Sequence, residues 1–294
     1  MIQTSGFFYP LKPLPDDRGE VNLEVLYESP EGDCILLKGH RNDRIVVYKA
    51  LKKAYRDDPV HQRMLRREYE IGVSLKHPVI CEVLSWVTLP DYGDSIEMEW
   101  IDGCTLDQWI KTHALHKRQL RRIFLQICDA LSYMHQKRVF HKDLKPANIL
   151  VTSSGDYVKL IDFGLSDTES ILTGKDPAGT WRYAAPEILA GERADESCDI
   201  YSLGIIIREC SGRSFSGIAR KCAAHDKSKR YASALDVKMA LINSGRRWIW
   251  MVVATLVTFA AVAGALFYSN RENSVEQLFM DAAEQVREAS NPSL

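Results

Sequence analysis

The sequence has no CxxC pair and no cysteine with a histidine at the spacing of a metal site. Its seven cysteines are dispersed through apolar segments: Cys34, Cys81, Cys104, Cys128, Cys198, Cys210 and Cys222. Dispersed cysteines in an odd number are typical of reduced, partly buried thiols in a cytosolic domain. This pattern argues against a disulfide framework and against a structural zinc centre.

An excess of charge of one sign is also missing. The 294 residues include 38 lysines and arginines against 39 aspartates and glutamates, for a net charge of -1. A chain with this balance has no electrostatic reason to bind nucleic acid, so we expect no nucleic-acid partner. The first residues lack the basic start and long apolar core of a signal peptide, and no internal repeat occurs.

One long hydrophobic run is present near the C-terminus. Residues 248–268, WIWMVVATLVTFAAVAGALFY, contain no charged side chain and have aromatic residues at both ends. A helix of this length would be roughly 31 Å long, which matches the hydrocarbon core of a bilayer. The sequence therefore predicts a single transmembrane helix that contacts membrane lipid; a buried core helix is the alternative. Arg246 and Arg247 before the run favour placing residues 1–247 in the cytoplasm.

The rest of the pattern divides the chain into a β-rich part and a helical part. Apolar runs predict strands at 21–29, 33–39, 44–51, 83–89 and 95–101, with one helix at about 60–76. Further helices are expected within 105–138 and near 184–190, 199–210, 215–224 and 233–243. The predicted fold is α+β and has two lobes, with a hinge near 99–103 and a ligand in the crevice between the lobes.

The stretch HKDLKPAN (141–148), followed by IDFG (161–164), carries the chemistry. A loop, a hairpin and a second loop would bring Asp143, Lys145, Asn148 and Asp162 to one side of the fold. Two carboxylates, an amide and an ammonium suit a magnesium ion that carries phosphates, because magnesium prefers oxygen ligands and takes few from protein. Phosphoryl transfer depends on positioning and charge neutralisation more than on covalent chemistry.

These motifs resemble the eukaryotic-type serine/threonine protein kinase family over residues 21–245. The resemblance implies the bilobal protein kinase fold, with a small β-rich N-lobe at about 21–101 and a larger helical C-lobe at about 102–245. The C-lobe is shortened, because little sequence separates the helix near 199–210 from Arg230. Residues 1–20 would be an N-terminal extension. ATP and Mg2+ are the cofactors that the resemblance implies.

The resemblance also implies catalytic roles. Asp143 would accept or orient the proton of the substrate hydroxyl, and Lys145 would meet the γ-phosphate. Asn148 and Asp162 would hold magnesium. All four residues match the family's catalytic-loop and DFG motifs at the expected positions.

A further set of residues is expected to bind ATP. Lys49 in VVYK would grip the α- and β-phosphates, and Glu68 would pair with that lysine. The other contacts would come from the phosphate loop, the roof over adenine, the gatekeeper and the hinge backbone, which correspond to Tyr27, Ser29, Gly32, Cys34, Val47, Met98, Glu99 and Ile101.

The segment GTWRYAAPE (179–187) resembles the GTxxYxAPE segment of the family. Thr180 would contact Asp143 and shape the acceptor site, and Glu187 would pair with Arg230. Asp199 would anchor the catalytic loop from a buried helix. This segment, together with the lysine two residues after Asp143, resembles kinases that act on serine and threonine rather than on tyrosine.

The phosphate loop departs most from the family pattern. The usual GxGxxG reads Tyr27-x-Ser29-x-x-Gly32, so only one glycine remains. Glycines let a backbone approach phosphates and adopt conformations that a Cβ forbids. We therefore expect a looser cover over ATP.

Other departures change fit and regulation. Val47 and Cys34 replace the residues that usually form the roof over adenine, which alters the fit without removing a charged group. Lys142 replaces an arginine that often binds a phosphorylated activation loop, and lysine lacks the bidentate fork of arginine. Switching by phosphorylation of the activation segment would therefore be weakened; the candidate positions are Thr168, Ser170 and Thr173.

The expected function is transfer of the γ-phosphate of ATP to serine or threonine hydroxyls of an unidentified protein substrate. Every charged group that the reaction uses is present, which favours an active enzyme. The alternative is a pseudokinase-like binding or scaffold module, because the phosphate loop is degenerate. A small-molecule phosphotransferase is the third reading.

The last residues, 269–294, would form a short tail outside the membrane. Apolar residues at helical spacing, among them Leu278, Phe279 and Val286, predict an amphipathic helix that contacts a membrane-protein partner. A frayed end is the other interpretation. The arrangement resembles bacterial kinases anchored in the inner membrane by one helix; a eukaryotic tail-anchored protein is the alternative.

Overall fold

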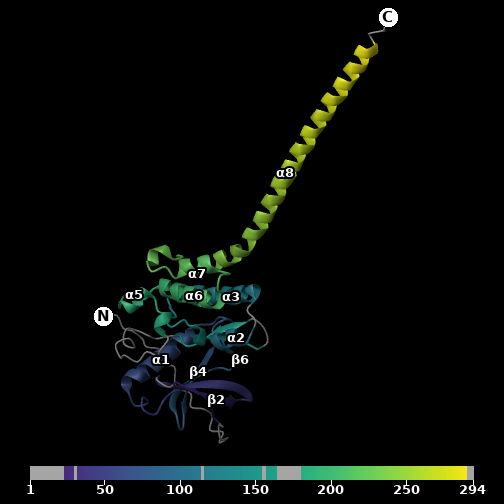
Figure 1. Ribbon diagram of the computed structural model, residues 1–294. Coiled ribbons are helices and arrows are strands. Elements are labelled where there is room, and N and C mark those ends of the chain that lie inside the picture. The colour runs from purple at the N-terminus through teal and green to yellow at the C-terminus, as the bar shows by residue number, and fades with distance from the viewer. Residues whose placement is uncertain (1–22, 30–31, 114–115, 154–156, 164–179, 290–294) are drawn as a thin grey trace, which may run out of the picture. The chain divides into compact units, whose positions relative to one another are not determined.

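The computed structural model describes residues 23–29, 32–113, 116–153, 157–163 and 180–289. Within these ranges, the backbone alone is described at 180, 245–251, 269–277, 284 and 287–289. The chain divides into two compact units, Met1–Leu241 and Ile242–Leu294. The first unit holds the strands and every helix except most of the last one (Figure 1).

The N-lobe is built on a five-stranded antiparallel sheet. Its strands are β1 (Glu24–Glu28), β2 (Cys34–Arg41), β3 (Arg44–Leu51), β4 (Val83–Leu89) and β5 (Gly93–Glu99), in the spatial order β1-β2-β3-β5-β4. Asn42 and Asp43 join β2 to β3 with φ angles of 49° and 61°. Two such residues make the tight turn that matches the twist of a hairpin. All five strands lie where the apolar runs predict them, to within a few residues.

One helix, α1 (Pro59–Ser74), packs on this sheet (Figure 1). Asp58 begins it, because its side chain accepts a hydrogen bond from the Val60 N–H at 2.9 Å and Pro59 fits the first turn. Gly72 allows close packing, since a Cβ there would lie 2.4 Å from Val83 Cγ2. The helix therefore holds its inward-facing side chains close to the sheet.

The C-lobe is mainly helical. Its helices are α2 (Leu106–Thr112), α3 (Lys117–Gln136), α5 (Pro186–Leu189), α6 (Glu196–Ser211) and α7 (Ser216–Cys222), with short 3-10 turns η1 (Pro146–Asn148), η2 (Thr180–Arg182) and η3 (Lys227–Lys229). A small sheet of β6 (Gly103–Thr105), β7 (Ile149–Thr152) and β8 (Val158–Leu160) lies beside them. The core includes Phe124, Ile127, Leu203 and Ile206, all fully buried. The predicted α+β bilobal architecture is confirmed.

The last helix, α8 (Ala234–Ala289), is longer than the sequence suggests. A helix at 233–243, a separate span at 248–268 and a helical tail were expected, whereas one helix runs through all three because no proline interrupts it. Where side chains are described, no helix is both long enough and apolar enough to cross a membrane, and the predicted span at 248–268 stays a prediction.

Candidate active site

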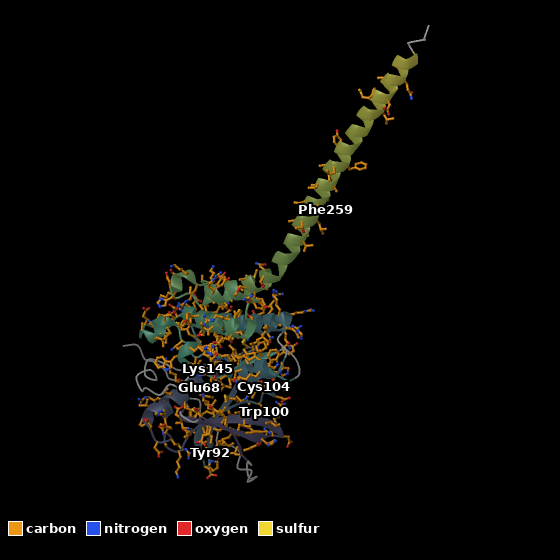
Figure 2. All side chains as sticks on the ribbon, in the orientation of Figure 1. Glu68, Tyr92, Trp100, Cys104, Lys145 and Phe259 are labelled. Carbon is orange, nitrogen blue, oxygen red and sulfur yellow. The ribbon has the colours of Figure 1, made fainter. Side chains whose placement is uncertain are left out.

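Lys49 is the buried centre of a cluster of three charged side chains. Its Nζ lies 2.7 Å from Glu68 Oε1, 2.9 Å from Glu68 Oε2 and 2.6 Å from Asp162 Oδ1. The three side chains come from β3, α1 and the segment after β8, and Figure 2 marks Glu68. Burial alone would lower the pKa of Lys49, but the carboxylates of Asp162 and Glu68 outweigh it and hold that pKa well above its usual value. Lys49 therefore stays charged between two acids.

The loop at residues 141–148, which we call the catalytic loop, brings three predicted residues together. Lys145 Nζ is 2.8 Å from Asp143 Oδ2, and Figure 2 marks Lys145. Asn148, in η1, donates from Nδ2 to the Asp143 carbonyl and to Asp143 Oδ2, both at 2.9 Å. Because the amide nitrogen is used in this way, the amide oxygen of Asn148 is the atom that suits a cation.

A buried carboxylate holds the start of this loop. Asp199, on α6, accepts hydrogen bonds from the backbone N–H groups of His141 and Lys142, each at 2.9 Å. Lys142 has a φ of 63°, a left-handed conformation that a side chain rarely adopts. Burial opposes ionisation of Asp199, but its hydrogen bonds and His135 lower its pKa. The ionised Asp199 thus fixes an unusual backbone beside Asp143.

His135 is a residue that the motifs do not reveal. It lies on α3, and its Nε2 is 2.8 Å from Asp199 Oδ2. A histidine on the apolar face of a helix gives no signal of such a role, because its partner is 64 residues away.

The residues expected over ATP lie on or beside four strands of the N-lobe sheet, β1, β2, β3 and β5. Met98 on β5 is in register with Val47 on β3, and Cys34 opens β2. Burial raises the pKa of the Cys34 thiol well above its usual value, so the sulfur stays protonated. Tyr27, on β1, is 54% exposed. Ile101 follows β5, beyond Glu99.

The activation segment is described only at its end. Thr168, Ser170 and Thr173 lie outside the described residues, and Thr180 is described by its backbone in η2. The predictions for these four residues stay predictions.

Arg230 donates to Glu187 Oε1 at 2.5 Å and to Oε2 at 2.8 Å, which forms a bidentate pair with both residues buried.

Comparison with known proteins agrees with this geometry. Residues 30–242 match the family described as the protein kinase domain. The chain belongs to this family. Its kinase domain has the fold of the Mycobacterium tuberculosis PknI kinase domain, with a TM-score of 0.60 at 23% sequence identity, covering 76% of this chain and 96% of that one.

Curated relatives place the kinase domain more narrowly. Serine/threonine-protein kinase PrkC of Bacillus subtilis is 35% identical over 216 residues, which are 70% of this chain and 31% of PrkC. Serine/threonine-protein kinase PknB of Mycolicibacterium smegmatis is 33% identical over 208 residues, 66% of this chain and 32% of PknB. The chain carries a serine/threonine protein kinase domain and spans about a third of the length of these relatives.

An ion pair joins Glu99, the last residue of β5, to β8, the strand before Asp162. Lys159, on β8, forms a hydrogen bond with Glu99 Oε1, and that same oxygen accepts from the Glu82 N–H at 2.8 Å. The Glu99 N–H donates to the Glu82 carbonyl at 3.0 Å. Because both Lys159 and Glu99 are partly buried, this pair is screened less than a surface pair. No motif marks Lys159, since its partner is 60 residues away.

We expect Lys159→Met to destabilise the domain by roughly 1–2 kcal/mol, because a partly buried charged hydrogen bond is lost. That loss corresponds to a Tm decrease of about 2–8 °C, which thermal unfolding would measure. Lys76→Met is the matched control: Lys76 pairs with Glu82 at 2.7 Å on the same network, but both side chains are about half exposed. An exposed pair contributes roughly 0–1 kcal/mol. An equal Tm decrease in both variants would contradict the inference that the partly buried Lys159–Glu99 pair stabilises the domain more than the exposed Lys76–Glu82 pair.

Proposed function

We propose that this protein transfers the γ-phosphate of ATP to serine or threonine hydroxyls of a protein substrate. The observation that carries the proposal is the joint placement of two charge clusters, Lys49 with Glu68 and Asp162, and Asp143 with Lys145 and Asn148. Phosphoryl transfer needs groups of this kind held in fixed positions around the phosphates. Lys49 and Glu68 lie on β3 and α1, Asp143 and Lys145 lie on the catalytic loop, whose start Asp199 fixes, and Asp162 follows β8.

The proposed reaction assigns one task to each group. Asp143 orients the acceptor hydroxyl and takes its proton as the oxygen attacks the γ-phosphorus, while the bond from that phosphorus to the oxygen bridging to the β-phosphate breaks and ADP leaves. Lys145 neutralises the charge of the transferred group, and its contact with Asp143 keeps both side chains at the same point. Lys49 holds the α- and β-phosphates, and Glu68 fixes the lysine in place.

Magnesium fits this site by its donor chemistry. Among the described residues, no three histidine, cysteine, aspartate or glutamate side chains gather as a metal site. The expected ligands are instead the amide oxygen of Asn148 and the carboxylate of Asp162, which are hard oxygen donors of the small number that magnesium takes from protein. When bound, the ion would neutralise charge on the phosphate oxygens.

The test is a transfer assay with the full chain in detergent micelles, γ-labelled ATP, magnesium and a basic protein as acceptor. Label is expected on phosphoserine or phosphothreonine after acid hydrolysis of the product. Label on phosphotyrosine would refute the acceptor class.

A binding-only function is the second candidate, and one contact favours it. The Gly32 N–H, an amide that a glycine-rich loop could offer to phosphate, donates to Ser29 Oγ at 2.8 Å. A phosphate loop with this contact has one fewer backbone N–H to offer to the phosphates of ATP. ATP binding by the wild type, with no transfer above an inactive variant, would favour this second function.

We also propose that residues 248–268 anchor the protein in a membrane, with the kinase domain on the cytoplasmic side. The support is the uncharged run of 21 residues after Arg246 and Arg247. On α8, the apolar side chains described within the run, such as Phe259 (76%) and Val257 (62%), are exposed and need an apolar surrounding (Figure 2). The bacterial relatives favour a bacterial inner membrane over a eukaryotic tail-anchored location. The part of α8 that follows residue 268, where Leu278 and Phe279 are exposed, would contact a membrane-protein partner.

Flotation with phospholipid vesicles tests the anchor. The full chain is expected to float with the vesicles, whereas Val257→Arg with Val262→Arg is expected to stay at the bottom. Each arginine costs roughly 2.5–3.5 kcal/mol at the centre of a spanning helix. Val60→Arg with Val73→Arg, two exposed positions on α1, is the control and should float. Absence of the wild type from the vesicle fraction would refute the anchor.

A further inference from the structure

The turn between β1 and β2 is held by side chains. Ser29 Oγ accepts a hydrogen bond from the Gly32 N–H at 2.8 Å. A Cβ on residue 32 would lie 2.4 Å from that same oxygen, which is closer than atoms can approach. The contact between residue 32 and Ser29 Oγ therefore requires a glycine at position 32. Residues 30 and 31 of the turn lie outside the described residues.

Lys52 binds this turn from the neighbouring strand. It follows β3 directly, and its ammonium donates to the Ser29 carbonyl. The same ammonium is 3.9 Å from Glu28 Oε1, and the Lys52 N–H donates to the Asp33 carbonyl at 2.7 Å. The Lys52 side chain is only 17% exposed. Lys52 therefore contacts both the start and the end of the turn.

A phosphate loop with one glycine has two weaknesses here: its backbone has less freedom to take the required shape, and Glu28 repels the phosphates. The contacts of Ser29 and Lys52 address both. A glycine-rich loop takes its shape from backbone freedom, whereas Ser29 and Lys52 fix the shape here by direct hydrogen bonds. Glu28 would repel a polyanion, and the Lys52 ammonium, 3.9 Å from this 58% exposed carboxylate, offsets part of its charge.

We propose that Lys52 is a positioning residue for ATP, which fixes Ser29 and Asp33 beside the phosphates and offsets the charge of Glu28. This inference rests on the proposed function, because it places the phosphates beside these residues. Lys52 acts through Ser29 and Glu28 and is assigned no contact with the reacting atoms.

The test compares ATP with adenosine, which lacks the phosphates. Equilibrium binding by calorimetry is measured for the full chain in detergent micelles with magnesium, for the wild type and for Lys52→Met. We expect the variant to bind ATP about fivefold or more weakly, as the loss of a charged, partly buried hydrogen bond implies. Adenosine affinity should be unchanged, because Lys52 contacts Ser29 and Glu28, and neither is among the residues expected to contact adenine.

Two variants make the result specific. Lys53→Met removes the same charge from the exposed neighbouring residue and should leave ATP affinity unchanged. Lys52→Arg should restore most of it, because arginine can donate to both partners. The proposal is overturned if Lys52→Met leaves ATP affinity unchanged, if ATP and adenosine weaken equally, or if Lys53→Met has as large an effect.

A second substitution covers a folding failure of Lys52→Met. Lys52→Gln keeps a donor for the Ser29 carbonyl but carries no charge to offset Glu28, so it should weaken ATP binding more than adenosine binding, and an unchanged ATP affinity would overturn the proposal. Failure of the proposed function is a separate result. Binding that depends on Lys52 without any phosphate transfer would refute the function alone, whereas a wild type that binds no ATP would refute both.

Discussion

Asp143→Asn is expected to reduce phosphate transfer by about 10³-fold, while ATP binding changes by no more than about twofold. The asparagine keeps the shape of the side chain but cannot take the proton of the acceptor hydroxyl. It also removes the charge that Lys145 Nζ contacts at 2.8 Å. Because the lost interaction belongs to the transition state, kcat should fall and the KM for ATP should not. Initial rates over a range of ATP concentrations would measure both.

The control is Asp91→Asn, at an exposed position between β4 and β5 and away from the catalytic loop. It removes the same charge and should leave the rate unchanged. Equal rates for the wild type and Asp143→Asn would contradict the assignment of Asp143, and would favour the binding-only function if the wild type still bound ATP.

Much of this site could be predicted because its residues belong to motifs in a fixed order. Lys49, Asp143 and Asp162 are far apart in sequence, yet each was placed by its own short pattern. The pairing of Glu68 with Lys49 followed from the same order, and the structure has the two side chains 2.7 Å apart. Their catalytic roles stay predictions until the variants are assayed.

The contacts that escaped prediction depend on side chains that no pattern marks. Lys52 and Lys159 look like ordinary surface lysines in the sequence, and only the fold brings them to Ser29 and to Glu99. The length of α8 is not predicted either, because a change from polar to apolar residues along a chain is typical of separate elements. Helix continuity depends on the backbone, and no proline breaks α8.

Arg230→Met is expected to destabilise the kinase domain by roughly 3–5 kcal/mol, because it leaves the Glu187 carboxylate buried without its partner. Arg230 also donates to the carbonyls of Ala224 and Ser197, so the loss extends to the segment before α8 and to α6. We expect a Tm decrease of about 10 °C, measured by tryptophan fluorescence during heating.

Two further variants distinguish the loss of the Arg230–Glu187 ion pair from a general effect of removing a positive charge. Lys227→Met removes a cation that lies 3.5 Å from Asp195, with both side chains nearly half exposed, and should lower the Tm far less than Arg230→Met does. Glu187→Leu with Arg230→Met removes both charges and should be more stable than Arg230→Met alone. A double variant less stable than the single one would contradict an ion-pair explanation.

The Arg230–Glu187 ion pair also predicts that the unfolding free energy of the kinase domain depends on pH. Burial opposes ionisation of Glu187, but hydrogen bonds from Arg230 outweigh it and lower its pKa from 4.5 to about 2. Since the folded pKa is depressed, the stabilisation is complete above about pH 4.5 and is lost as the pH falls toward 2, amounting to about 3 kcal/mol. In Arg230→Met, burial without a partner should raise the Glu187 pKa instead, so protonation relieves the variant. The difference in unfolding free energy between wild type and variant should therefore shrink between pH 5 and about pH 3, whereas a constant difference would show that Glu187 does not couple to Arg230.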